Sequence, residues 1–152
     1  MAASAWEVFN AAKHNLGLGL IDLSGDTINI GLFRTSASAI LRTTISTHAS
    51  IGSFTSSAGG NGDYKEALGS LVWTGSDSAN DPTRYWDCAD PVFTASSSAI
   101  SQVRYAVIWT SGASAGASKL ICYAALSTAE FDVANSNTLT VQMAAGGIFT
   151  LT

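Results

Sequence analysis

Short runs in which hydrophobic and polar positions alternate, separated by Gly-, Ser- and Asn-containing turns, dominate this chain. Runs of this kind predict strands, because alternate side chains of a strand face opposite sides of a sheet. The predicted strands cover residues 27–35, 64–74, 84–88, 92–94, 103–110, 119–126, 138–143 and 148–151. Many short strands with regular turns are typical of a β-sandwich or jelly roll. No linker interrupts the pattern, so we expect a single mainly β domain over residues 1–152.

Two of these runs are nearly continuous in apolar residues, which is typical of strands at the centre of a fold. They are VRYAVIWT at 103–110 and KLICYAAL at 119–126, and their spacing predicts a hairpin. Residues 36–51 show no clean period. Residues 50–63 are rich in Gly and Ser, and this composition favours an exposed, flexible loop.

The N-terminal segment has a helical pattern instead. Ser4 and Glu7 have the S-x-x-E spacing of a capping box, in which each side chain satisfies a backbone N–H of the first turn. Apolar residues recur after them at helical intervals. We therefore predict a short helix over about residues 5–15, with its Trp6 and Phe9 side docked on a sheet.

Composition indicates a neutral surface. Only 12% of the 152 residues are charged, and 74 are Ala, Ser, Thr or Gly. Neutral surfaces associate more readily than charged ones, so we expect copies of the same chain or a partner to cover much of this surface. The net charge of −4 and the scattered basic residues argue against nucleic acid as a partner. No run approaches the roughly 18 apolar residues of a membrane span, and the first residues do not resemble a secretory signal.

Candidate catalytic and metal-binding residues are few. His14 and His48 have no nearby ligand partner, and the chain has no C-x-x-C or H-x-x-x-H spacing. Residues 112–116 match G-x-S-x-G, but a nucleophile elbow needs a helix after the serine and a histidine later in the chain. We therefore expect no catalytic residues, no bound metal and no cofactor.

Paired aspartates and cysteines have simple structural interpretations. The aspartates at 22 and 26, and at 87 and 90, flank predicted turns, where Asp commonly bonds nearby backbone N–H groups. Calcium binding is the alternative for these carboxylates. Cys88 and Cys122 are too few for a disulfide framework, so we expect two buried free thiols in a protein folded in a reducing compartment.

An ordered set of motifs runs through nearly the whole chain. The first is F-N-x-A-K-x-x-L-x-x-G-x-I-D-L-x-x-D-T-I at 9–28, and the others are DPVF at 90–93, RYAVIW at 104–109, LICY at 120–123 and GIFTL at 147–151. In this order they resemble a family of small virion proteins of tailed bacteriophages. The chain departs from the family in its long 50–62 loop, and in Asn29, where the family tends to have Lys.

The resemblance implies a structural role in the phage particle, as a capsid decoration or cement protein. It implies a β-rich homotrimer on the outer capsid surface of the virion, assembled in the host cytoplasm, with the major capsid protein and its own copies as partners. No catalytic residue is implied. Terminal segments and loops can become ordered on a partner, so the N-terminal helix and the 50–63 loop are the expected contact elements. The interface residues that we predict within them are Trp6, Phe9, Ser57, Gly60 and Asn61.

Two other function classes remain open at this point. One is a tail, connector or fibre component that binds a host glycan through exposed aromatic side chains such as Trp73 or Trp86. The other is a phage-encoded enzyme, which the lack of a credible catalytic set disfavours.

Overall fold

Antiparallel pairing of short strands builds the molecule, which is seen here in a computed structural model that describes residues 4–34, 65–67, 72–74, 84–96, 98–111, 117–144 and 146–151. The elements are β1 (Glu7–Val8), α1 (Asn10–Gly17), β2 (Ile28–Phe33), β3 (Lys65–Ala67), β4 (Val72–Thr74), β5 (Arg84–Asp87), β6 (Val92–Thr94), β7 (Ile100–Val103), β8 (Tyr105–Thr110), β9 (Leu120–Ala125), β10 (Phe131–Val133), β11 (Thr138–Thr140) and β12 (Phe149–Leu151). The prediction of a mainly β fold with one short N-terminal helix is confirmed.

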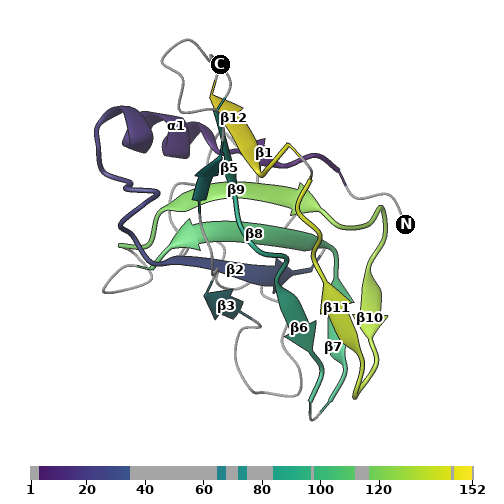
Figure 1. Ribbon diagram of the computed structural model, residues 1–152. Coiled ribbons are helices and arrows are strands. Elements are labelled where there is room, and N and C mark those ends of the chain that lie inside the picture. Colours follow the sequence, from purple (N-terminus) through teal and green to yellow (C-terminus); the bar gives the residue numbers. More distant parts are fainter. Residues whose placement is uncertain are drawn as a thin grey trace.

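Two sheets form the body of a β-sandwich, as Figure 1 shows. The larger sheet has the strand order β1-β9-β8-β2-β3, and the smaller one has the order β12-β5-β4. Two further ribbons, β11-β6 and β10-β7, extend from them at the lower right of Figure 1. The predicted hairpin of the two apolar strands is confirmed, since β8 pairs with β9 in antiparallel register.

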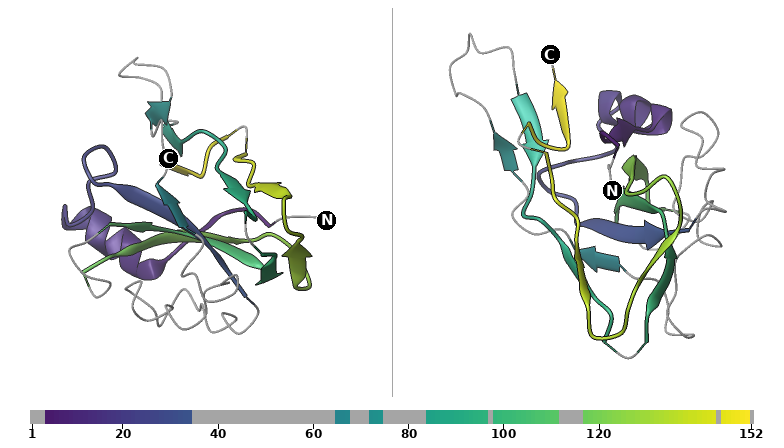
Figure 2. Two further views of the ribbon diagram at one scale, coloured as in Figure 1. Left: turned by 90° about the horizontal axis from the view of Figure 1, so that it is seen from below. Right: turned by 90° about the vertical axis from the view of Figure 1, so that its right-hand side faces the viewer.

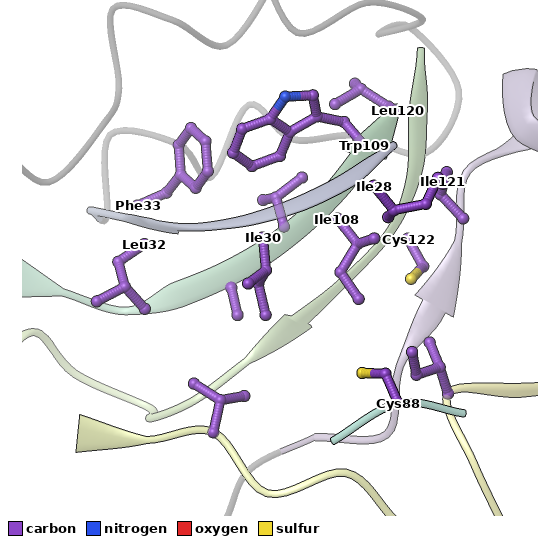
Figure 3. Packing of buried hydrophobic residues seen from close by; sticks show 14 of the residues in the cluster. Ile28, Ile30, Leu32, Phe33, Cys88, Ile108, Trp109, Leu120, Ile121 and Cys122 are labelled. Carbon is purple, nitrogen blue, oxygen red and sulfur yellow. The ribbon is translucent and has the colours of Figure 1, made fainter. Parts of the chain in front are cut away.

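The core lies between the two sheets. In Figure 3, Ile108 and Cys122 of the larger sheet point toward Cys88, which follows β5. On the other side of the larger sheet, Phe33 and Trp109 pack edge to face with ring centroids 6.2 Å apart. Strands covered on both faces bury successive residues instead of alternate ones, which explains the continuous apolar runs of β8 and β9.

The predicted helix start is wrong. Residues 7 and 8 form β1, which pairs with β9 through Glu7 and Tyr123 and through Val8 and Cys122. α1 begins only at Asn10 and ends at Gly17, without a side-chain cap. Pairing with an existing sheet supplies backbone hydrogen bonds that a capping box would otherwise supply, and here the sheet prevails over the local S-x-x-E signal.

Other boundaries also differ from the prediction. The run at 64–74 contains two strands in different sheets, because β3 pairs with β2 and β4 pairs with β5. The run at 103–110 is interrupted at Arg104, and its first residue belongs to β7. Gln102 in β7 has a φ of 60°, which is a left-handed backbone conformation. The pattern of hydrophobic and polar residues cannot predict such a conformation. β10 was also missed, and it pairs with β7. The predictions for 36–63 lie outside the described residues.

Candidate functional site

A neutral cavity beside the N-terminal segment is one candidate interaction site. It has a volume of about 370 Å³. Its lining consists of uncharged side chains and backbone from two segments: Ser4, Ala5, Trp6, Gln142, Ala144, Gly147 and Ile148. Pockets of this size and mixed polarity are typical of sites that accept a ligand or an anchoring side chain.

Backbone hydrogen bonds hold both walls of this cavity. On one wall, the N–H of Ser4 donates to the carbonyl of Ala125, and Ser4 Oγ accepts the N–H of Ala125 in return. On the other wall, Gly147 has a φ of 76° and donates to the carbonyl of Ala144. The next N–H, of Ile148, donates to the carbonyl of Trp86 in β5. These hydrogen bonds fix both walls of the cavity within the single chain.

A second candidate is an exposed apolar turn at the end of α1, formed by Leu18, Gly19 and Leu20 and called here the leucine turn. Leu18 is 59% exposed and Leu20 is 52% exposed. Three backbone bonds fix the turn: Leu18 donates to His14, Gly19 to Leu16 and Leu20 to Asn15. Gly19 has a φ of 66°, which glycine adopts without steric cost. The sequence gives a weak signal for this site, namely two leucines that flank a glycine just beyond the helix.

The predicted interface residues fall into three groups. Trp6 is half-buried and lines the cavity. Phe9 is fully buried, with its ring centroid 5.1 Å from that of Tyr123, so it is a core residue and not part of a contact surface. Ser57, Gly60 and Asn61 lie outside the described residues.

The aspartates of the 22–26 segment stabilise a turn, as predicted. Asp22 Oδ1 accepts the backbone N–H of Ser24 at 2.9 Å and that of Gly25 at 3.0 Å, as well as the Ser24 hydroxyl. These hydrogen bonds hold the pKa of Asp22 below its ordinary value. The bond from the Ser24 side chain has the largest effect, and the two backbone bonds come next. Asp26 in turn accepts the N–H of Asp22 at 3.0 Å.

The second aspartate pair also bonds the backbone. Asp87 accepts the N–H of Cys88 at 2.9 Å, and Asp90 accepts the N–H of Met143 at 2.8 Å. Among the described residues, no group of three or more His, Cys, Asp or Glu side chains converges on a possible metal position.

Both cysteines are buried free thiols, as the sequence predicts. Their side chains lie in the core between the two sheets (Figure 3). Burial, assisted by the charges of Asp87 and Asp90, raises the pKa of Cys88 to about 12. Burial also raises the pKa of Cys122 well above its usual range. Neither thiol is therefore a nucleophile at neutral pH.

The remaining candidates of the sequence are not brought together. His14 is exposed in the last turn of α1. Trp86 is fully buried, and its tilted ring lies 5.4 Å from that of Phe149, so it cannot stack on a sugar. His48, the 112–116 motif and the side chain of Trp73 lie outside the described residues.

Comparison with known proteins assigns no family to this chain. In the part of the chain that the structure describes, no helix is long and apolar enough to cross a membrane. The chain matches no family model, no curated protein and no solved structure.

Proposed function

We propose that this chain is a structural protein of a tailed-bacteriophage particle, a capsid decoration or cement protein that binds the outer surface of the major capsid shell as a homotrimer. The observation that carries the proposal is the ordered set of motifs between residues 9 and 151. Each motif alone is weakly specific, and the order of the whole set carries the resemblance.

The motif positions coincide with those on which the fold depends, and this agreement supports the shared fold that the proposal assumes. Phe9, Ile28 and Phe93 are each at most 1% exposed. The aspartates of the first motif build the turn before β2, and Ile108 and Cys122 fill the core between the sheets. A resemblance that follows the framework of a domain is evidence of a shared fold more than of a shared surface.

Surface chemistry gives a second, independent support. A decoration protein acts through many modest interfaces that together strengthen a shell. The chain is poor in charge, and it presents two exposed leucines and a neutral cavity. Uncharged surface with fixed apolar features is suited to association with other protein subunits.

Imaging of phage particles with and without this protein tests the proposal. We expect regular extra density on the capsid surface, lost in particles that lack the protein and restored when purified protein is added back. Particles without it should also open at lower temperature and under milder osmotic shock. Density confined to the tail would refute decoration and favour a tail or connector component. Unchanged particle stability would refute a cementing role.

A further inference from the structure

We infer that residues 4–8, called here the edge guard, form an autoinhibitory strap that keeps β9 of one copy of this chain from pairing with β9 of a second copy. The edge guard occupies the outer hydrogen-bonding edge of β9, and the strand it excludes is the same strand of another molecule. The inference is independent of the proposed function, because it depends only on how the larger sheet ends.

Successive residues of β9 bond alternately to the strands on its two sides, as in any antiparallel sheet. Leu126, just after β9, donates its N–H to the carbonyl of Arg104, just before β8. Counting back in twos, Ala124 and Cys122 face β8 as well. The residues between them face the opposite side of β9, where β1 is the end strand of the larger sheet in the described part of the chain.

The edge guard bonds the outward-facing groups of β9. Ser4 donates its N–H to the carbonyl of Ala125 at 2.8 Å, and Ser4 Oγ accepts the N–H of Ala125 at 2.9 Å. Glu7 pairs with Tyr123 in the strand ladder, and the Tyr123 hydroxyl donates to Glu7 Oε2 at 3.2 Å. Ser4 thus acts as a clamp at one end of the edge guard, because its side chain and its backbone bond the same residue of β9.

The edge guard is held more loosely than the residue that follows it. Its side chains are exposed or half-buried, whereas Phe9 is fully buried and donates its N–H to the carbonyl of Ile121 at 3.0 Å. Figure 1 and the left view of Figure 2 show the edge guard between the N-terminus and α1, which lie on opposite sides of the molecule. Segments with few buried apolar contacts open at the lowest free energy. Phe9 is therefore the anchor, and residues 4–8 are the part that can lift from β9.

An uncovered β9 would have no feature that resists pairing. Its sequence, LICYAA, contains no charge, no Pro and no Gly. Short uncharged segments of this kind associate readily, and two copies of one antiparallel edge are complementary about a two-fold axis. The edge guard supplies what β9 lacks, since β1 is only two residues long and contains the charged Glu7. Short length and charge are both means by which natural sheets protect an edge.

Residue-resolved amide hydrogen exchange of the full chain tests whether the edge guard covers β9. Ser4→Pro removes both bonds between Ser4 and Ala125. We expect exchange of the Tyr123 and Ala125 amides to rise about tenfold or more, and exchange of the β8-facing Cys122 amide to stay unchanged. Ala5→Pro is the matched control, because it places the same ring one residue along and leaves the Ser4 N–H and Oγ in place. Equal exchange in the two proline variants overturns the inference.

Ser4→Ala is a milder variant that keeps the test decisive if Ser4→Pro weakens the whole fold. It removes only the Oγ acceptor, so the Ala125 amide should exchange faster while the Tyr123 amide exchanges as in the wild type. If Ser4→Pro accelerates exchange on both sides of β9 alike, and Ser4→Ala leaves exchange at Ala125 unchanged, the edge guard does not protect this edge.

Sedimentation velocity over a concentration series tests the excluded pairing. Ser4→Pro should form a larger species than the wild type and Ala5→Pro form at the same concentration. A synthetic peptide with the sequence of residues 4–8 should reverse this association by refilling the edge, whereas the same peptide with proline in place of its serine should not. An opened edge without additional association, or association that the peptide leaves unchanged, overturns the inference.

Discussion

Gly147 lies in the turn between β11 and β12. Its replacement by alanine adds one carbon atom, and we expect this small change to lower the stability of the fold substantially. Its φ is 76°, and a Cβ there would lie 2.6 Å from the carbonyl oxygen of Trp86 and 2.7 Å from Cδ2 of Tyr85. That carbonyl cannot easily move, because it accepts the N–H of Ile148 at 2.7 Å. The left-handed conformation costs a non-glycine residue about 1–2 kcal/mol, and overpacking adds about 1–3 kcal/mol. A gain of about 0.4–1 kcal/mol from the stiffer unfolded chain offsets part of this.

Gly147→Ala should therefore lower the free energy of unfolding by about 2–4 kcal/mol, a large share of the usual 5–15 kcal/mol. Two matched variants separate the causes. Gly19 has a φ of 66°, but a Cβ there would meet open space. Gly19→Ala should therefore lower the free energy of unfolding by only about 1 kcal/mol. Gly146→Ala has neither constraint and should change stability by less than about 0.5 kcal/mol.

The assay is urea unfolding followed by tryptophan fluorescence, at one fixed protein concentration because association would add to apparent stability. Equal midpoints for Gly147→Ala and Gly146→Ala would refute the reasoning. A loss for Gly147→Ala no greater than for Gly19→Ala would show that the close contact with β5 carries no cost.

Three further predictions concern the core, the 22–26 turn and the thiols. Phe9→Ala should lower the free energy of unfolding by about 3–5 kcal/mol, because Phe9 is fully buried. Leu20→Ala removes an exposed side chain and should lower it by less than about 0.5 kcal/mol in dissociated protein. Equal urea midpoints for the two variants would contradict this. The pKa of Asp22 is lower in the folded state than its ordinary value of 3.8, so its contribution is present above that pH and is lost as the pH falls through the folded value. Asp22→Asn should flatten the decline of stability between about pH 5 and pH 2, and an unchanged slope would argue against the turn hydrogen bonds. Cys88 and Cys122 should resist iodoacetamide at neutral pH and react on unfolding in urea, as mass spectrometry would show; rapid labelling of native protein would contradict their burial and raised pKa values.

Much of the fold was predictable because its signals are local. Turn residues and apolar runs predicted the mainly β class, and the continuous runs of β8 and β9 predicted a central hairpin. The roles of Asp22 and Asp26 follow from short-range bonds to neighbouring N–H groups, which any Asp at such a turn can make. The low charge and the many small residues also predict a surface suited to association, and this stays a prediction.

Tertiary structure decided what depends on distant partners. Ser4 and Glu7 have a helical cap signal, yet the edge of β9 draws this segment into a strand and delays the helix to Asn10. Phe9 becomes core and Trp6 lines a cavity, although the sequence places both on one side of the same helix. The cavity has no local signature, because its walls, which include Trp6 on one side and Gln142 and Ile148 on the other, are far apart in the chain. Periodicity shows which residues avoid water, whereas only the packed sheets determine which neighbours cover them and which apolar residues, such as Leu18, are left exposed.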